Sequence, residues 1–201
     1  MCFFAGCSTT NTVNIDYSDV SEINYNNYVV QNKIDIKDNI LAVITSNITN
    51  DELWIYRDKS NIKSISSNQI SQCQVDKQGV YYVSDKSLYF YDIDNDETIN
   101  CVEGVHSFIL LDDVIAYNTF DSEIKFIDKN FNEVFHVSDA FLGAVSNDYV
   151  YYTDLDDVLY SVSIDDFEIE ELVTLDIYVQ PCEMNIVGNK LVMNQDDCFL
   201  I

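Results

Sequence analysis

A repeat of about 36 residues constrains the fold of this chain more than any other feature of its sequence. Residues 79–99 contain two apolar runs separated by a polar turn, and residues 148–169 repeat that arrangement. The second residue of the later run is, in successive units, Trp54, Tyr89, Lys125, Tyr160 and Phe199. The spacings between them are 35, 36, 35 and 39 residues. Repeats of this length are typical of solenoids, propellers and other arrays of small structural units.

Each unit contains up to four short runs of β-branched and aromatic residues, which favour strands. The first runs cover residues 33–36, 72–75, 107–111, 143–145 and 183–187. The second runs cover residues 40–43, 80–83, 114–117, 150–152 and 191–193. The third runs cover residues 53–56, 88–91, 124–127, 159–162 and 198–200. Fourth runs follow at residues 62–65, 98–102, 133–137 and 169–175.

Polar residues separate these runs and predict tight turns, because Asn, Asp and Ser side chains hydrogen-bond to nearby backbone. Helical repeats would need a 3.6-residue period, which is visible only faintly at residues 165–175. Four antiparallel strands in about 36 residues make one β-propeller blade. The sequence therefore predicts an all-β fold, a β-propeller of about five four-stranded blades.

An additional strand-like segment at residues 23–30 precedes the first unit, and the fifth unit stops in its third strand. Residues 21–201 number 181, close to five repeats of 36. Propellers commonly close by borrowing a strand from the opposite terminus, which removes an exposed edge. We therefore expect residues 23–30 to pair with residues 198–201, and the propeller domain to cover residues 21–201.

The charge balance limits the partners of this domain. Asp and Glu number 35 against 10 Lys and Arg, giving a net charge of −25. Such a surface repels a phosphate backbone, which argues against nucleic-acid binding, and it favours a soluble monomer. No apolar run approaches the roughly 20 residues that a membrane-spanning helix needs.

The N-terminus carries a second motif, Phe4-Ala5-Gly6-Cys7 followed by Ser and Thr residues. It resembles the lipobox of bacterial lipoproteins, in which small residues precede a cysteine that receives a lipid. The resemblance implies lipid modification at Cys7, a truncated signal and flexible tether at residues 1–20, and an extracytoplasmic place in the bacterial cell envelope. Only six residues precede Cys7, whereas a secretory signal needs about 7–15 apolar residues. Either the true start lies upstream or the chain is a fragment.

The repeats share a Val-Tyr-Tyr, Ser/Thr-Asp, Leu-Tyr pattern at residues 80–89 and 150–160. This pattern resembles the TolB-like and YncE-like bacterial propellers, particularly propeller lipoproteins of unknown function, over roughly residues 23–201. The resemblance supports the fold more strongly than a function, since propellers host unrelated activities. Because the residues give no cluster of acid/base groups and no cofactor motif, we expect a non-catalytic binding or scaffold module with a protein or carbohydrate partner at one rim. The alternative is a piece of a larger propeller enzyme, such as a glycosidase or lyase, whose catalytic residues are not in this chain.

The acidic run at residues 92–103 resembles an EF-hand calcium loop in its spacing. Asp92, Asp94, Asp96 and Glu103 fall at positions 1, 3, 5 and 12, but the Gly required at position 6 is replaced by Glu97. A strand over residues 98–102 would also carry Glu103 about 20 Å from the turn. We therefore interpret the run as a solvated turn with weak cation binding at most.

A second acidic group lies between the second and third strands of the fourth unit. It contains Asp154, Asp156 and Asp157, which lack even the partial calcium-loop spacing. We interpret it as a plain turn, again with weak cation binding at most. The sequence assigns no structural metal and no cofactor.

The two histidines give no catalytic or metal site, and the aromatic residues could form either a carbohydrate or peptide platform or part of the core. His106 falls in an innermost strand and His136 in an outermost one, so we expect them to lie apart. Adjacent aromatic residues such as Tyr81 and Tyr82 point to opposite faces of a blade and are interpreted as core. The same interpretation applies to Trp54, Tyr151 and Tyr152.

The cysteines of the repeats do not form a disulfide framework. Cys73 and Cys101 belong to the first and fourth strands of one blade, about 14 Å apart at the usual strand spacing. Cys182 and Cys198 lie about 10 Å apart by the same reasoning. Disulfides need Cα atoms within about 7 Å, so we expect free thiols.

Overall fold

The computed structural model describes residues 33–46, 49–146, 148–175, 184–187, 190–195 and 198–200. The first sheet contains β1 (Ile34–Lys37), β2 (Ile40–Ser46), β3 (Asp51–Arg57) and β4 (Ser60–Ser67). The second contains β5 (Ile70–Val75), β6 (Gly79–Ser84), β7 (Ser87–Asp92) and β8 (Glu97–Glu103). The third contains β9 (Val105–Leu110), β10 (Val114–Thr119), β11 (Ile124–Asp128) and β12 (Glu133–Val137). The fourth contains β13 (Ala140–Val145), β14 (Tyr149–Asp154), β15 (Val158–Ser163) and β16 (Ile169–Thr174). The fifth contains β17 (Met184–Val187), β18 (Lys190–Gln195) and β19 (Cys198–Leu200).

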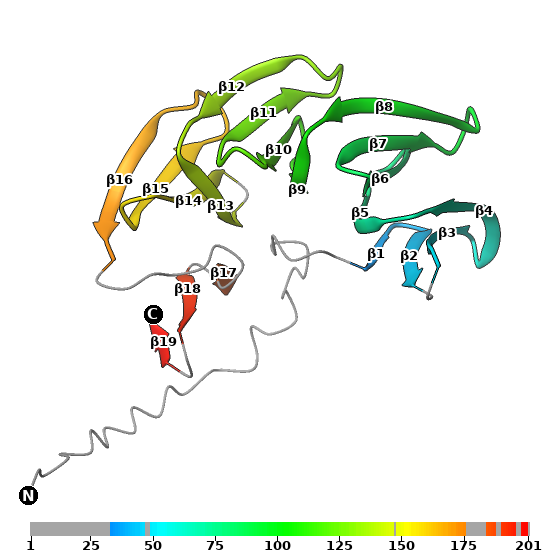
Figure 1. The fold of residues 1–201 in the computed structure, drawn as a ribbon, viewed down its shortest axis with the longest axis horizontal. Helices are drawn as coiled ribbons and strands as arrows, with labels where there is room; N and C mark the ends of the chain where they lie inside the picture. Colours follow the sequence, from blue (N-terminus) through cyan, green and yellow to red (C-terminus); the bar gives the residue numbers. More distant parts are fainter. Residues whose placement is uncertain are drawn as a thin grey trace, which may run out of the picture.

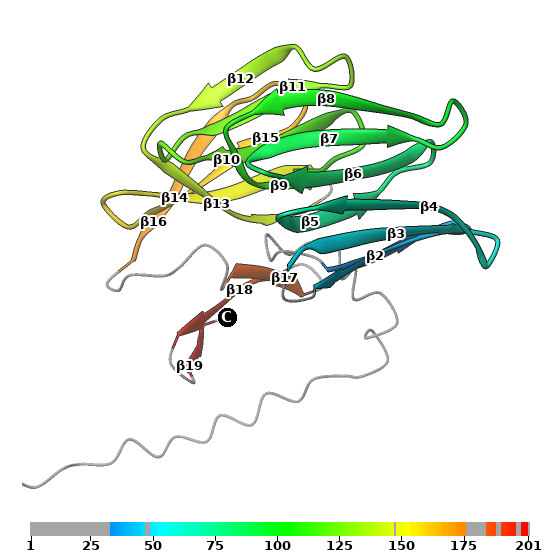
Figure 2. The same cartoon turned by 45° about the vertical axis from the view of Figure 1, so that its right-hand side comes forward.

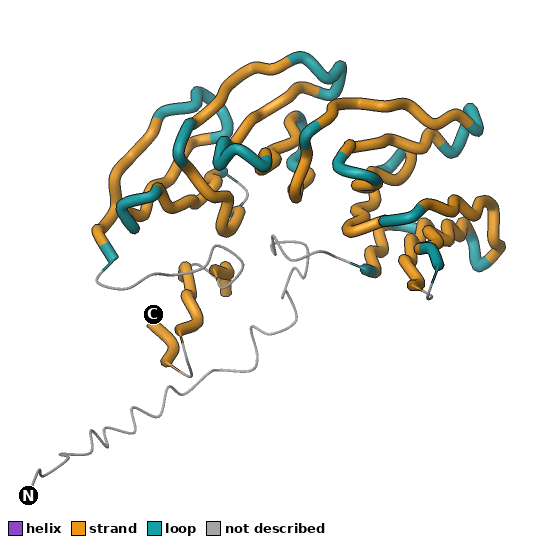
Figure 3. Tube along the Cα trace, in the orientation of Figure 1, coloured by secondary structure: helices purple, strands orange, loops and turns teal. Residues whose placement is uncertain are grey.

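The sheets follow one another in chain order along an arc, with the first strand of each sheet on the inside (Figure 1). The turned view shows the strands of the second and third sheets stacked outward from β5 and β9 (Figure 2). Every described residue in regular structure is in a strand, and the loops lie at the sheet edges (Figure 3). Contacts join β2 to β5, β5 to β9, β10 to β13 and β13 to β17. Radial four-stranded antiparallel sheets in sequence make a β-propeller.

The predicted strand positions are confirmed, including β16, where the sequence showed a faint helical period. In the described part of the chain, four sheets have four strands and the fifth has three, and the strand expected to complete the fifth is not among the described residues. Residues 23–30, Cys7 and the tether at residues 1–20 lie outside the described residues. The closed five-bladed ring and the domain boundary at residue 21 therefore stay predictions. Within the described part of the chain, no helix is long and apolar enough to cross a membrane.

Aspartates make many of the tight turns that glycine would make in other chains. Of the eleven described non-glycine residues with positive φ, six are Asp. Asp85 and Lys86 both have positive φ between β6 and β7, and Asp58 and Lys59 do the same between β3 and β4. Two-residue hairpin loops need this conformation, which Asp tolerates better than most residues. The chain therefore builds its hairpins with only 5 glycines.

The core lies between neighbouring sheets and uses both faces of each inner sheet. On β6, Val80 and Tyr82 pack toward the first sheet, while Tyr81 and Val83 pack toward the third. All six residues of β6 are buried. Alternate side chains of a strand point to opposite faces, so a sheet enclosed by two neighbours buries both. This confirms the interpretation of Tyr81 and Tyr82 as core, whereas Trp54 and Tyr151 are only half-buried.

Buried polar side chains link the innermost strands of successive sheets. An Asp35 carboxylate oxygen accepts the Val75 N–H at 2.6 Å. Gln74 occupies the equivalent position one sheet later and accepts the Leu110 N–H at 2.7 Å. These strands are not paired as a ladder, so the side chains provide partners that the inner backbone would otherwise lack. Burial raises the pKa of Asp35, although the N–H groups of Val75 and Ile36 oppose that shift.

The two described cysteine side chains are free thiols, as expected. Burial raises the pKa of both Cys73 and Cys101 to about 12. Because the thiolate is the reactive form, burial disfavours reaction of both thiols at neutral pH.

Candidate functional site

One edge of the propeller gathers the turns that join first to second strands and third to fourth strands. We call it the acidic rim, and its turns are residues 38–39, 58–59, 76–78, 93–96, 111–113, 129–132, 146, 148 and 164–168. Antiparallel connection places these turns on one edge and the remaining turns on the other. The carboxylates of the acidic rim belong to Asp92 and Asp128, at the strand ends that enter its turns, and to the turn residues Asp38, Asp58, Asp76, Asp94, Asp96, Asp112, Asp113, Asp148, Asp165, Asp166 and Glu168.

Aspartates order the acidic-rim turns between third and fourth strands in three successive sheets. Asp92, Asp128 and Asp166 each accept backbone N–H groups two to four residues further on, at 2.8–3.2 Å. Hydrogen bonds to the charged form lower the pKa of a carboxyl group. The pKa of Asp92 is lowered chiefly by the Asn95 side chain, that of Asp128 by the Asn132 N–H, and that of Asp166 by the Ser163 hydroxyl. These three carboxylates therefore stay ionised at neutral pH.

The acidic run at residues 92–103 starts in one of these turns, between β7 and β8. Asp94 forms an ion pair with Arg57 at 2.9 Å, and Asp96 forms one with Lys63 at 2.6 Å. Both cations come from the first sheet, so this turn fastens two neighbouring sheets at their outer strands. Exposed pairs of this kind contribute about 0–1 kcal/mol each.

Glu103 lies at the other end of β8. In the β7–β8 register Glu97 is opposite Asp92, whereas Glu103 is opposite Ser87. Six residues of extended strand separate the two glutamates by about 20 Å. The structure therefore brings Asp92, Asp94 and Asp96 together and leaves Glu103 at the opposite edge, away from any shared calcium loop.

Asp154, Asp156 and Asp157 lie on the edge opposite the acidic rim, between β14 and β15. An Asp154 oxygen accepts the N–H groups of Asp156 and Val158, both at 2.9 Å. This is the hydrogen-bonding pattern of an ordinary Asp-initiated turn. Among the described residues, no group of three or more His, Cys, Asp or Glu is arranged to hold a metal ion. Weak cation binding at either turn stays a prediction.

The two histidines lie on different strands of the third sheet, as the sequence predicts. His106 is exposed on β9, with its ring 5.3 Å from that of Phe120. His136 is exposed on β12 and lies 3.2 Å from a Glu133 oxygen. The structure does not bring them together.

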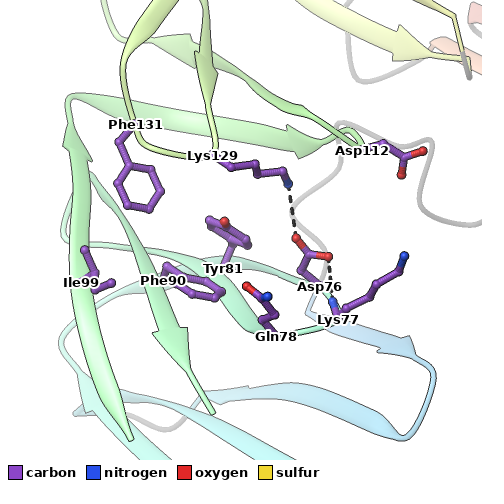
Figure 4. A pocket seen from close by; sticks show the side chains of 9 residues that line it. All are labelled: Asp76, Lys77, Gln78, Tyr81, Phe90, Ile99, Asp112, Lys129 and Phe131. Carbon is purple, nitrogen blue, oxygen red and sulfur yellow. Dashed lines mark hydrogen bonds and ion pairs between the residues drawn. The ribbon is translucent and has the colours of Figure 1, made fainter. Parts of the chain in front are cut away.

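A pocket of about 330 Å³ opens at the acidic rim between the second and third sheets (Figure 4). Its lining comes from the β5–β6, β9–β10 and β11–β12 turns and from β6, β7 and β8. The lining residues are Asp76, Lys77, Gln78, Tyr81, Phe90, Ile99, Asp112, Lys129 and Phe131. Figure 4 shows the apolar side chains at one end and the charged ones at the other.

Asp76 organises the charged end of the pocket. Its carboxylate lies 3.3 Å from the Lys129 ammonium and 3.9 Å from that of Lys37, and it accepts the Lys77 N–H at 2.7 Å. Burial raises the pKa of this carboxyl, but the Lys77 N–H and the two ammonium groups outweigh burial, so the pKa is lowered. Lys129 also lies 5.4 Å from the centre of the Tyr81 ring. Asp76 therefore holds Lys129 over an aromatic wall.

The apolar end of the pocket is built on the Tyr81–Phe90 pair, whose ring centroids are 4.5 Å apart. Gly79 makes this close packing possible. A Cβ atom there would lie 2.0 Å from the Tyr91 carbonyl oxygen and 2.8 Å from the Phe90 ring. Sequence reasoning missed the pocket because its walls come from two repeats, and Gly79 in a glycine-poor chain was the available signal.

Comparison with known proteins supports the fold but does not assign the chain to a family. No family model matches the chain, and no curated protein matches it. Among solved structures, the N-terminal domain of Nup159 has a TM-score of 0.59 at 9% identity, over 86% of this chain and 60% of that one. BamB from Moraxella catarrhalis has a TM-score of 0.58 at 11% identity, over 85% and 59%. Hsv2 from Kluyveromyces lactis has a TM-score of 0.53 at 12% identity, over 83% and 57%.

These neighbours are β-propellers, so the chain has a propeller fold. The chain spans about three-fifths of the length of each. Propellers host unrelated activities, and the site must therefore carry any argument about function.

Proposed function

We propose that this protein is a non-catalytic binding or scaffold propeller whose acidic rim binds a basic protein partner. The observation that carries the proposal is that Asp92, Asp128 and Asp166 order the turns between the third and fourth strands of three successive sheets. Asp92 and Asp128 hold equivalent positions in their sheets, whereas Ser163 holds that position in the fourth sheet and Asp166 lies three residues further on. Ionised carboxylates on these three turns place negative charge along one edge of successive sheets. One of the similar solved structures is of an assembly that includes Nup159 and Gle1, which is consistent with a protein partner.

Electrostatics determines what this rim can select. A single exposed ion pair contributes little, but the summed field of many like charges steers a complementary surface and repels an acidic one. The screening length is about 8 Å at physiological ionic strength. Binding at the rim should therefore favour basic partners and weaken as salt is added.

A peptide library displayed on phage and selected for binding to the full chain tests the rim. The affinity of the selected peptides is then compared between two triple variants. Asp92→Asn/Asp128→Asn/Asp166→Asn removes the three rim charges, and because Asn can still accept the N–H groups the turns should persist. Selected peptides should be rich in Lys and Arg. Their affinity for this variant should be about tenfold lower than for the parent at low salt.

The matched control is Asp85→Asn/Asp121→Asn/Asp157→Asn, which removes three charges from the opposite edge and should change binding less than about twofold. Selected peptides without an excess of basic residues would contradict the proposal. So would equal weakening by the two triples.

We also propose that Cys7 is lipid-modified and holds the propeller on the outer face of a bacterial membrane. The support is the lipobox-like Phe4-Ala5-Gly6-Cys7 with its polar tether. Expressed with a complete upstream signal, the protein should incorporate labelled fatty acid and sediment with membranes. Cys7→Ser should abolish both, while Cys2→Ser, a change within the removed signal, should preserve both. Membrane association that persists in Cys7→Ser would refute the anchor.

We propose, finally, that the ring has five blades and is closed by residues 23–30. Four sheets with four strands and a fifth with three described strands support this count.

A further inference from the structure

We infer that the pocket between the second and third sheets binds a free α-amino acid with a large apolar side chain. The pocket is distinct from the carboxylates of the acidic rim that are proposed to bind a partner. Either proposal can be correct if the other is wrong. The inference depends on the size of the pocket, on its division into two ends, and on the signs of the charges at its mouth.

The size of the pocket suits a small molecule. Its volume of about 330 Å³ lies at the low end of the range of about 300–1,000 Å³ found for ligand sites. A nucleotide or an oligosaccharide would extend well beyond it. A single amino acid would fit within it.

The apolar end favours a large hydrophobic group. The Tyr81 and Phe90 rings form a wall that is itself nearly covered, with exposed fractions of 3% and 8%, so the apolar surface open to a ligand comes mainly from Ile99 and Phe131. Ile99 on β8 and Phe131 on the β11–β12 turn face this wall and are half-buried (Figure 4). An aromatic or branched side chain placed here would be removed from water on several sides and would contact aromatic rings.

The charged end presents both signs. Within the described residues, Asp76 and Lys129 neutralise each other, whereas the Lys77 ammonium and the Asp112 carboxylate have no ion-pair partner. Lys77 and Asp112 are exposed and come from turns of different sheets. A ligand with one charge would match only one of them. An α-amino acid carries a carboxylate for Lys77 and an ammonium for Asp112 beside its apolar side chain.

Calorimetric titration of the full chain with L-phenylalanine tests the inference, using two analogues that each lack one charge. Phenethylamine lacks the carboxylate, and 3-phenylpropanoate lacks the ammonium. Each should bind about tenfold more weakly than phenylalanine, as expected for the loss of one charge-assisted contact. Glycine, which lacks the apolar group, should not bind measurably.

Two charge variants make the test specific. Lys77→Met should lower the affinity for phenylalanine about tenfold, and this variant should no longer bind phenylalanine more tightly than phenethylamine. Asp112→Asn should also lower the affinity for phenylalanine about tenfold, and this variant should no longer bind phenylalanine more tightly than 3-phenylpropanoate. Lys59→Met and Asp113→Asn change similar exposed charges outside the pocket lining and should leave binding within about twofold.

Nitrogen-15 NMR spectra should place the ligand-induced shifts at residues 76–81, 90, 99, 112 and 129–131, and melting curves of all variants should overlay that of the parent. The inference is overturned if phenylalanine shows no saturable binding at millimolar concentration. It is equally overturned if phenethylamine binds as tightly as phenylalanine, or if Lys77→Met and Asp112→Asn behave like their controls.

Discussion

Replacing Gln72 with alanine should lower the free energy of unfolding by about 3–5 kcal/mol, although this residue is polar and belongs to neither candidate site. Gln72 is fully buried on β5. Its side-chain oxygen accepts the Phe108 N–H at 3.0 Å, and its amide nitrogen donates to the Phe108 carbonyl at 2.7 Å. Truncation would leave the buried Phe108 N–H without its partner, at a cost of about 1–3 kcal/mol, and would open a cavity. The Phe108 carbonyl would keep only the longer contact of 3.5 Å from the Gln74 amide.

Urea denaturation with two further variants separates the hydrogen bonds from the packing. Gln69→Ala removes an exposed glutamine from the β4–β5 turn and should change stability by less than about 0.5 kcal/mol. Gln72→Leu restores most of the volume but not the hydrogen bonds, so it should remain well below the parent in stability. A Gln72→Leu protein as stable as the parent would show that the contacts to Phe108 contribute little.

The blades could be predicted from the sequence because their determinants are local. Alternation of apolar residues every second position sets the strands, and Asp or Asn at the turns sets the hairpins. The segment around Val80 and Leu88 therefore folds where its pattern indicated. Even β16 follows the repeat, because pairing with β15 prevails over a weak helical period.

The links between blades were not predictable in the same way. A glutamine in a strand, such as Gln72 or Gln74, has no sequence signature that distinguishes a bridge to the next sheet from an exposed side chain. Its role depends on a neighbour 36 residues away along the chain. The Asp35–Val75 contact shows the same device one sheet earlier, and only the structure relates the two.

Of the candidate sites, one was interpreted correctly from the sequence and one was missed. The acidic run at Asp92 was interpreted as a turn because an extended strand must separate it from Glu103, and the β7–β8 register places the two as that argument requires. The pocket beside Tyr81 was missed because no single repeat contains it. Lys129 reaches Asp76 across 53 positions of sequence, and local patterns carry no information about such a pair.

Ring closure gives the other large expected effect. If residues 23–30 supply the outermost strand of the fifth blade, deleting residues 1–31 should expose the edge of β19 and lower stability by several kcal/mol. For a domain of this size, that corresponds to a fall in melting temperature of roughly 10 °C or more, or to aggregation through the open edge. Deleting residues 1–20 should shift the melting temperature by less than about 3 °C, because that segment is the predicted tether.

A pair of proline substitutions distinguishes the loss of a strand from a general effect of shortening the chain. Tyr28→Pro would remove a backbone donor inside the proposed strand, whereas Thr12→Pro makes the same change in the predicted tether. Proline is excluded from the interior of a paired strand, so only Tyr28→Pro should destabilise the full chain. Equal melting temperatures for these two variants would mean that residues 23–30 are not paired. The edge of β19 would then need a different partner, and closure of the ring by residues 23–30 would be refuted.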